Sequence, residues 1–211
     1  MKRFQMITEA DARVLDYGST VALVAGGHIT PLALDTLRAR RIVLVREGVD
    51  VDVETLAPTS EVRTVAIAGD HTSVALKAVL RDHLRGRGMA VHDLGTDTSE
   101  PVDYPDTAAA VALQVARGEA DAGIVIDGAG LGSTIAANKV AGIRAAMCSS
   151  QTLARYAREH NGANVLALGS TLVTPAEAVT IVETFVTTPM REPRYIRRLA
   201  KIRALENRPQ R

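Results

Sequence analysis

The stretch that most constrains this chain runs from residue 123 to residue 139 and reads GIVIDGAGLGSTIAANK. Residues 124–126 form an apolar run typical of a strand covered on both faces. Three glycines then alternate with small residues before a helix start: Gly128, Gly130 and Gly132. Glycine lets the backbone approach a ligand closely, and N–H groups ahead of a helix bind anions. With Asp127 ending the strand, the pattern predicts a site at the carboxyl edge of a sheet; the alternative is a tight turn with a solvated aspartate.

From residue 63 onward, strand patterns alternate with helix patterns. Such alternation predicts a parallel sheet with helices on both faces, so we expect a Rossmann-like three-layer α/β sandwich with five parallel strands. The strands are expected at residues 64–68, 89–94, 124–126, 142–147 and 165–168. The helices are expected at residues 74–84, 106–117, 152–160, 177–187 and 192–206.

The first part of the chain has a different organisation. Residues 1–48 are expected to form a small α/β module, with helices at 10–15 and 31–40 and strands at 20–24 and 41–45, the first strand broken by Gly26–Gly27. A unit of this size buries little core alone, so we expect it to dock on another surface. Residues 49–62 carry four acids and one proline and are interpreted as a linker, which leaves residues 63–211 as the main domain.

Composition excludes several classes of protein. A net charge of +1 gives no general attraction to nucleic acid or to a membrane surface, and six aromatic residues, none of them Trp, argue against a base-stacking platform. The single cysteine, Cys148, excludes a disulfide framework and is expected to be inert core. No HExxH or EF-hand spacing indicates a metal site. The N-terminus lacks the apolar segment of a secretory signal, which favours a cytoplasmic protein.

Several polar residues are candidates for chemistry. If the first and third strands are neighbours, Asp70 and His71 share a crevice with Asp127 and form a plausible acid/base site, although Asp70 could instead cap a helix. His160 ends a helix, where it either complements the helix dipole or acts as an acid/base group. Arg194 and Arg198 share one helix face, which suits either a phosphate clamp or a solvated basic surface.

Five stretches of the main domain resemble the ribose-5-phosphate isomerase B family, which includes galactose-6-phosphate isomerase subunits and four-carbon sugar phosphate isomerases. They are AIAGDH (66–71), VDYPD (102–106), GEADAGIVIDGAGLGSTIAANKVAGIRAA (118–146), AREHNGANVLALGS (157–170) and RYIRRLAKI (194–202). The resemblance implies an aldose–ketose isomerase that works through a cis-enediolate without a metal or an organic cofactor. It also implies a homodimer or a dimer of dimers, with each site built from two chains.

The resemblance also implies roles for single residues. Asp127 stands where the family has its catalytic cysteine base, and His160 matches the ring-opening histidine. Eight positions match substrate-binding residues: Asp70 and His71; the backbone cradle of Gly128, Gly130 and Gly132; Asn161; and the phosphate clamp of Arg194 and Arg198.

Three positions depart from the family pattern: Asp127 replaces cysteine, Ala129 replaces threonine, and Thr171 replaces arginine. One branch of the family has a glutamate base where this chain has Ser133. A carboxylate is a competent base for proton transfer, especially if desolvation raises its pKa. We therefore expect isomerisation of ribose 5-phosphate and ribulose 5-phosphate. The alternatives are an isomerase of another, four-carbon sugar phosphate, and a non-catalytic sugar-phosphate-binding protein.

The N-terminal module resembles short modules on some bacterial microcompartment proteins, such as ethanolamine-utilisation proteins. The pattern that carries the resemblance is ITEADARVL followed by GSTVALVAGGHITPLALDTLRARRI. It implies delivery to a protein shell, with shell or cargo proteins as partners. The alternative is an ordinary extension that packs on the surface of the oligomer.

Overall fold

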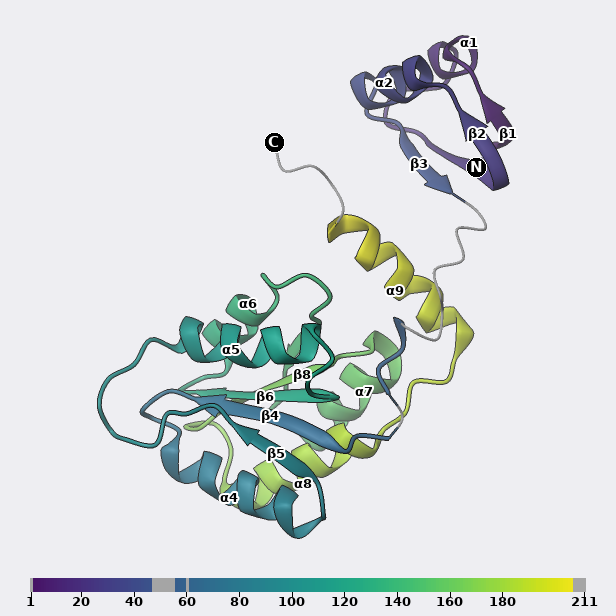
Figure 1. Cartoon of the computed structure of the whole chain (residues 1–211). Helices are drawn as coiled ribbons and strands as arrows, with labels where there is room; N and C mark the ends of the chain where they lie inside the picture. The colour runs from purple at the N-terminus through teal and green to yellow at the C-terminus, as the bar shows by residue number, and fades with distance from the viewer. Residues whose placement is uncertain (1, 47–55, 60, 207–211) are drawn as a thin grey trace. The chain divides into compact units, whose positions relative to one another are not determined.

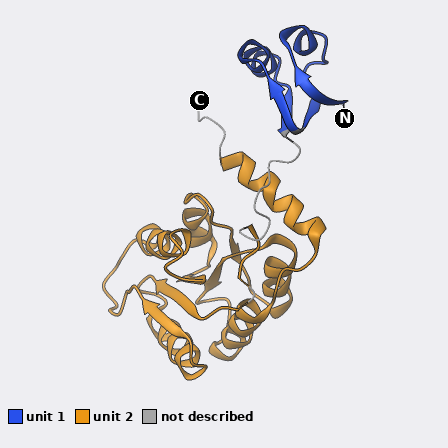
Figure 2. Ribbon diagram, turned by 45° about the vertical axis from the view of Figure 1, so that its right-hand side comes forward, with its two compact units in different colours: residues 1–52 blue, residues 53–211 orange. Residues whose placement is uncertain are grey.

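The structure, a computed structural model, describes residues 2–46, 56–59 and 61–206 (Figure 1). The chain divides into unit 1, residues 1–52, and unit 2, residues 53–211 (Figure 2). Of the predicted linker, residues 49–55 and 60 lie outside the described residues, while Leu56 and Val62 near its end are buried. Among the described helices, none has the length and apolar character needed to cross a membrane.

Unit 1 is a three-stranded parallel sheet in the order β1-β2-β3 with two short helices. Its elements are β1 (Lys2–Ile7), α1 (Glu9–Arg13), β2 (Thr20–Ile29), α2 (Pro31–Ala39) and β3 (Val43–Arg46). Thr8 caps α1 in a capping box with Asp11, and Thr30 caps α2 ahead of a proline. Val21, Leu23 and Leu37 lie in its core, together with further small and branched apolar residues.

Two features of unit 1 differ from the sequence predictions. Strand β1 was not predicted, because its residues are mostly polar or exposed and give no apolar alternation. Strand β2 runs through Gly26–Gly27 to Ile29 instead of breaking there. A Cβ on Gly27 would lie 2.9 Å from the carbonyl oxygen of Gln5, so the glycine permits β1 to pair closely at a register shift. The two predicted helices are confirmed.

Unit 2 is a five-stranded parallel sheet in the order β5-β4-β6-β8-β7, with helices on both faces (Figure 1). Buried side chains alternate along its strands: Ile124 and Ile126 of β6 pack with α4, α7 and α8, whereas Val125 packs with α5 and α6. The elements are β4 (Thr64–Gly69), α4 (Val74–Gly86), β5 (Ala90–Asp93), α5 (Tyr104–Ala116), β6 (Ala122–Asp127), α6 (Leu131–Ala137), β7 (Ala145–Met147), α7 (Gln151–Asn161), β8 (Val165–Gly169), α8 (Pro175–Thr187) and α9 (Pro193–Glu206).

The predicted parallel sandwich is confirmed, and one of its strands is three residues shorter than predicted. The strand expected at 142–147 begins only at Ala145, because Gly142 turns with φ of 82° and the Arg144 N–H donates to the Asn164 side chain instead of a neighbouring strand. Strand β6 lies between β4 and β8, with Asp127 paired to Gly169. The loops after these three strands therefore meet at one edge of the sheet.

Candidate active site

The loop after β6 closes on the carboxylate of Asp127. One carboxylate oxygen, Oδ1, accepts hydrogen bonds from the N–H of Ala129 at 2.8 Å and from the N–H of Gly130. The other, Oδ2, accepts from the N–H of Ser133 at 2.8 Å. Gly130 takes a φ of 76°, and a Cβ there would lie 3.0 Å from the carbonyl carbon of Leu168, so the turn requires glycine. Asp127 thus supplies the anion that its own loop binds.

These contacts control the pKa of Asp127. Burial of the carboxyl group raises its pKa, but the side chain and N–H of Ser133 and the N–H groups of Gly130 and Ala129 outweigh burial, so the pKa lies below the ordinary 3.8. The condition that would make this carboxylate a stronger base, a pKa raised overall by desolvation, is therefore not met. The Ser133 hydroxyl lowers the pKa of Asp127 because it lies close to the carboxylate. It is fully buried, yet it forms no hydrogen bond of standard geometry within the described residues.

The first turn of α6 leaves donors beside this carboxylate. The N–H groups of Leu131 and Gly132 form no hydrogen bond within the described part of the chain. The Tyr104 ring lies against Gly132, where a Cβ would come within 2.6 Å of it. Gly128 is bound to the loop after β8, because its carbonyl oxygen accepts a hydrogen bond from the Thr171 hydroxyl at 2.6 Å. Two unpaired N–H groups and a phenol ring therefore border the loop.

The loop after β4 lies beside the loop after β6, as the sequence predicted from adjacent strands. The Asp70 N–H donates to the Ile126 carbonyl at 3.0 Å, and the Asp70 carboxylate accepts from the N–H and the hydroxyl of Thr72. The Thr72 hydroxyl lies 3.3 Å from the Ser170 hydroxyl, which links this loop to the one after β8. His71 accepts a hydrogen bond through Nδ1 at 3.4 Å from the N–H of Val102.

His160 lies at the opposite edge of the sheet. It is near the end of α7, which leads directly into the start of β8, whereas Asp127 pairs with the last residue of β8. A strand from Val165 to Gly169 spans about 13 Å, so the end of α7 and the end of β6 lie at opposite ends of β8. The His160 ring stacks on Tyr156 at 4.7 Å between ring centroids and meets Tyr195 at 4.6 Å.

The two predicted clamp arginines gather around the same aromatic cluster. The guanidinium carbons of Arg194 and Arg198 lie 4.7 and 5.4 Å from the centre of the Tyr195 ring on α9. Asn161 donates to the Tyr156 carbonyl at 3.3 Å. The predicted residues therefore form two groups. The loop group holds Asp70, His71, Asp127, Gly128, Gly130 and Gly132, and the α7–α9 group holds His160, Asn161, Arg194 and Arg198.

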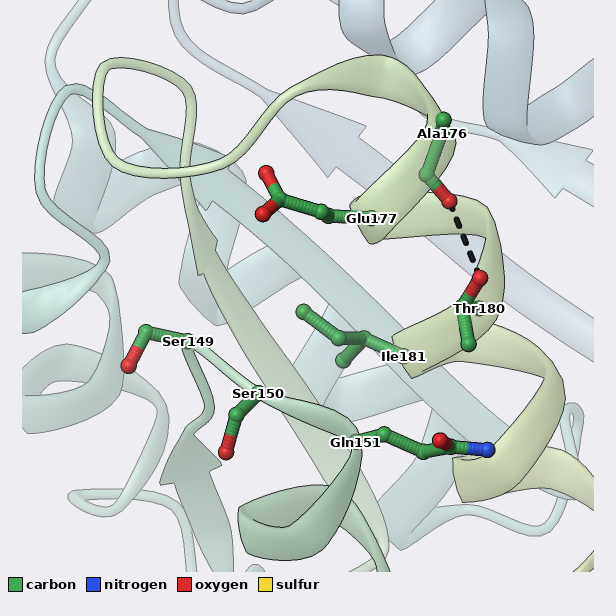
Figure 3. A pocket seen from close by; sticks show the side chains of 7 residues that line it. All are labelled: Ser149, Ser150, Gln151, Ala176, Glu177, Thr180 and Ile181. Carbon is green, nitrogen blue, oxygen red and sulfur yellow. Dashed lines mark hydrogen bonds between the residues drawn. The ribbon is translucent and has the colours of Figure 1, made fainter.

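A cavity of about 350 Å³ is lined by residues that belong to neither group (Figure 3). Three of its polar side chains are already hydrogen-bonded within the helices that form it. Ser150 caps α7, Glu177 accepts from the N–H and hydroxyl of Thr174, and the Thr180 hydroxyl donates to the Ala176 carbonyl at 3.1 Å. We therefore assign no chemistry to this cavity.

Sequence reasoning missed three aromatic residues that border the two groups. It noted Ser133 only as the position of another branch's base and did not predict its contact with Asp127. Tyr104, Tyr156 and Tyr195 were not singled out, although Tyr156 precedes His160 by one helical turn and this spacing predicts contact.

Comparison with known proteins shows the family of the chain. Residues 65–202 match the family model described as Ribose/Galactose Isomerase. Ribose-5-phosphate isomerase B of Escherichia coli K12 is 44% identical over 146 residues, which cover 69% of this chain and 98% of that protein. A putative sugar phosphate isomerase of Rickettsia bellii is 37% identical over 138 residues, which cover 65% of this chain and 96% of that protein.

Solved structures give the same result. Ribose-5-phosphate isomerase B of Clostridium thermocellum is 47% identical with a TM-score of 0.67, and the match covers 68% of this chain and 97% of that one. The Mycoplasma genitalium enzyme with bound ribulose-5-phosphate is 40% identical with a TM-score of 0.67, covering 69% of this chain and 97% of that one. Family model, relatives and fold agree, and the chain is an isomerase that belongs to the Ribose/Galactose Isomerase family.

Proposed function

We propose that this protein interconverts ribose 5-phosphate and ribulose 5-phosphate, with Asp127 as the base. The observation that carries the proposal is a buried, ionised carboxylate next to the backbone N–H groups of Leu131 and Gly132, which have no hydrogen-bond partner among the described residues. A base beside oxyanion donors suits proton abstraction next to a carbonyl group. The relative that binds ribulose-5-phosphate supports the choice of substrate.

The proposed reaction moves one proton between neighbouring carbons. Asp127 removes the proton from C2 of the open-chain aldose, and the developing oxyanion is held by the free loop N–H groups. The same carboxyl group returns the proton to C1, while a proton passes from the oxygen on C2 to the oxygen on C1. Because the pKa of Asp127 is low, the base is ionised at neutral pH but weak, so the mechanism depends strongly on stabilising the enediolate.

The substrate is proposed to bind between two chains of a homodimer or of a dimer of dimers. In one chain the loop group and the α7–α9 group lie at opposite edges of the sheet, so neither alone offers both a base and a phosphate clamp. His160 and Asn161 of one chain would open the sugar ring, Arg194 and Arg198 would hold the phosphate, and Asp127 of the other chain would move the proton. Exposed apolar side chains near the loop support pairing there: Leu131, Ile135 and Leu172.

Mixed dimers test the shared site. Asp127→Asn and His160→Ala are each expected to be inactive, but co-expressed chains form some dimers in which one site carries both native residues. If half of the dimers are mixed and each has one intact site of two, the mixture regains about 25% of wild-type activity. A mixture as inactive as its parents would contradict sharing. Equal activity of wild type and Asp127→Asn would show that Asp127 is not the base.

A substrate panel separates the remaining alternatives. Preferential turnover of a four-carbon sugar phosphate would reassign the substrate within the same chemistry. Sugar phosphates that raise the Tm without being turned over would favour a binding protein.

For unit 1 we propose a docking role, with a microcompartment shell as its destination; the folded βαβαβ core supports an independent module. Co-sedimentation with isolated shells, with and without residues 1–52, tests this proposal.

A further inference from the structure

Residues 56–59, here called the arm, precede the part of the chain that matches the family. The match begins at residue 65 and covers nearly the whole length of the relatives, so the arm is an addition to the shared domain. The arm nevertheless packs into unit 2, where the Leu56 side chain is only 3% exposed. An added segment with a buried side chain requires a local partner in the domain.

Two arginines of the domain, the buried Arg158 and the half-buried Arg144, are that partner. Arg158 is fully buried, and its Nη2 donates to the Thr59 carbonyl at 2.9 Å, while its other nitrogens donate to the carbonyls of Ala163 and Thr188. Arg144 donates from Nη2 to the Leu56 carbonyl at 3.1 Å. Neither guanidinium has a carboxylate within 4 Å among the described residues, so backbone carbonyls supply their acceptors and the arm provides one to each.

The arm ends at the corner where α7 meets α9. A Cβ built on Gly162 would lie 3.3 Å from Cδ of Pro58 and 2.6 Å from Cδ1 of Leu199, so the arm and α9 converge on one glycine. That glycine follows His160 and Asn161 directly. Leu199, only 1% exposed, follows Arg198 on α9. The arm therefore borders the elements that carry the whole α7–α9 group.

We infer that the arm is a positioning segment for the sugar-phosphate site: docked on Arg144 and Arg158, it fixes the corner of α7 and α9 and thereby orients His160, Arg194 and Arg198. The inference rests on the proposed function only for the role of these side chains. The holding of α9 by the arm is a separate claim and has its own measurement.

The test uses the full-length protein with Leu56→Lys. An ammonium group would replace a buried apolar side chain, on a segment whose carbonyl groups are already bound by two guanidinium groups, so the arm is expected to undock. Leu32→Lys, the same change at an exposed leucine of unit 1, is the matched control. Amide hydrogen exchange across residues 193–206 is expected to speed up at least about tenfold in Leu56→Lys alone. KM for ribose 5-phosphate is expected to rise about fivefold or more, with a smaller change in kcat.

The outcomes separate the two claims. Unchanged exchange in α9, while exchange in the arm itself accelerates, would overturn the inference. Faster exchange in α9 with an unchanged KM would support positioning by the arm and contradict the assignment of Arg194 and Arg198 to the phosphate. If Leu56→Lys does not fold, Pro58→Gly removes only the ring that packs toward Gly162, and it is expected to shift exchange and KM in the same direction by smaller factors.

Discussion

Replacing Asp127 by asparagine should destabilise the empty protein as well as abolish its activity. The carboxylate accepts three backbone hydrogen bonds and is only 5% exposed. Asparagine keeps one acceptor oxygen for Ala129 and Gly130 but turns an NH₂ group toward the N–H of Ser133. Hydrogen bonds to charged groups contribute about 1.5–3 kcal/mol each, so losing one and weakening two is expected to lower the free energy of unfolding by about 2–4 kcal/mol at pH 7.

The same variant predicts a pH dependence. The pKa of Asp127 is lower in the folded chain than in the unfolded chain, so the ionised group stabilises the fold above the ordinary value near 3.8. This stabilisation is lost as pH falls through the lowered folded pKa. The difference in the free energy of unfolding between wild type and Asp127→Asn should therefore be constant from about pH 5 to about pH 7. It should shrink below pH 3.8.

Urea unfolding followed by circular dichroism, at neutral and acid pH, measures both effects. Asp106→Asn, a change at an exposed aspartate in unit 2, is the control and is expected to change stability little. Equal stability of wild type and Asp127→Asn at pH 7 would refute the view that the loop is held by its own carboxylate. A difference that does not narrow in acid would show that the effect is not due to ionisation of Asp127.

Two further predictions follow from buried groups. Ser133→Ala removes a hydroxyl that lowers the pKa of Asp127, so the acid limb of the kcat/KM profile should move to higher pH; a profile identical to wild type would exclude this role. Burial raises the pKa of Cys148 to about 12, so the native protein at pH 8 should resist a thiol reagent that reacts fully in urea, and rapid reaction of the native protein would contradict its burial.

The sequence was most informative where local patterns agree with tertiary burial. Continuous apolar runs such as 124–126 become strands covered on both faces, and their alternation with helices is enough to predict the parallel sandwich. Strand β1 escaped prediction because it pairs along an exposed edge, where burial does not select apolar residues. The glycines at 26–27 were interpreted as a break in the strand, because local sequence patterns do not show that the backbone of β1 passes close to them.

Prediction of the site was limited in a different way. The adjacency of Asp70 and Asp127 follows from strand order, which alternation alone leaves open and the structure supplies. The pKa of Asp127 could not be predicted, because burial and hydrogen bonding act in opposite directions and only the loop geometry decides which is larger. The role of the arm was equally hidden, because its carbonyl groups are bound by Arg144 and Arg158 from distant parts of the chain.

The closure of the β6–α6 loop on Asp127 has a consequence for the thermodynamics of ligand binding. A loop held by three hydrogen bonds to an internal anion loses its conformational entropy during folding, before any substrate arrives. Binding then needs no further ordering of this backbone, so the empty and occupied loops should share one conformation. The loop around the proposed base is thus expected to be rigid, and any adjustment to a sugar is expected to come from the elements that face it.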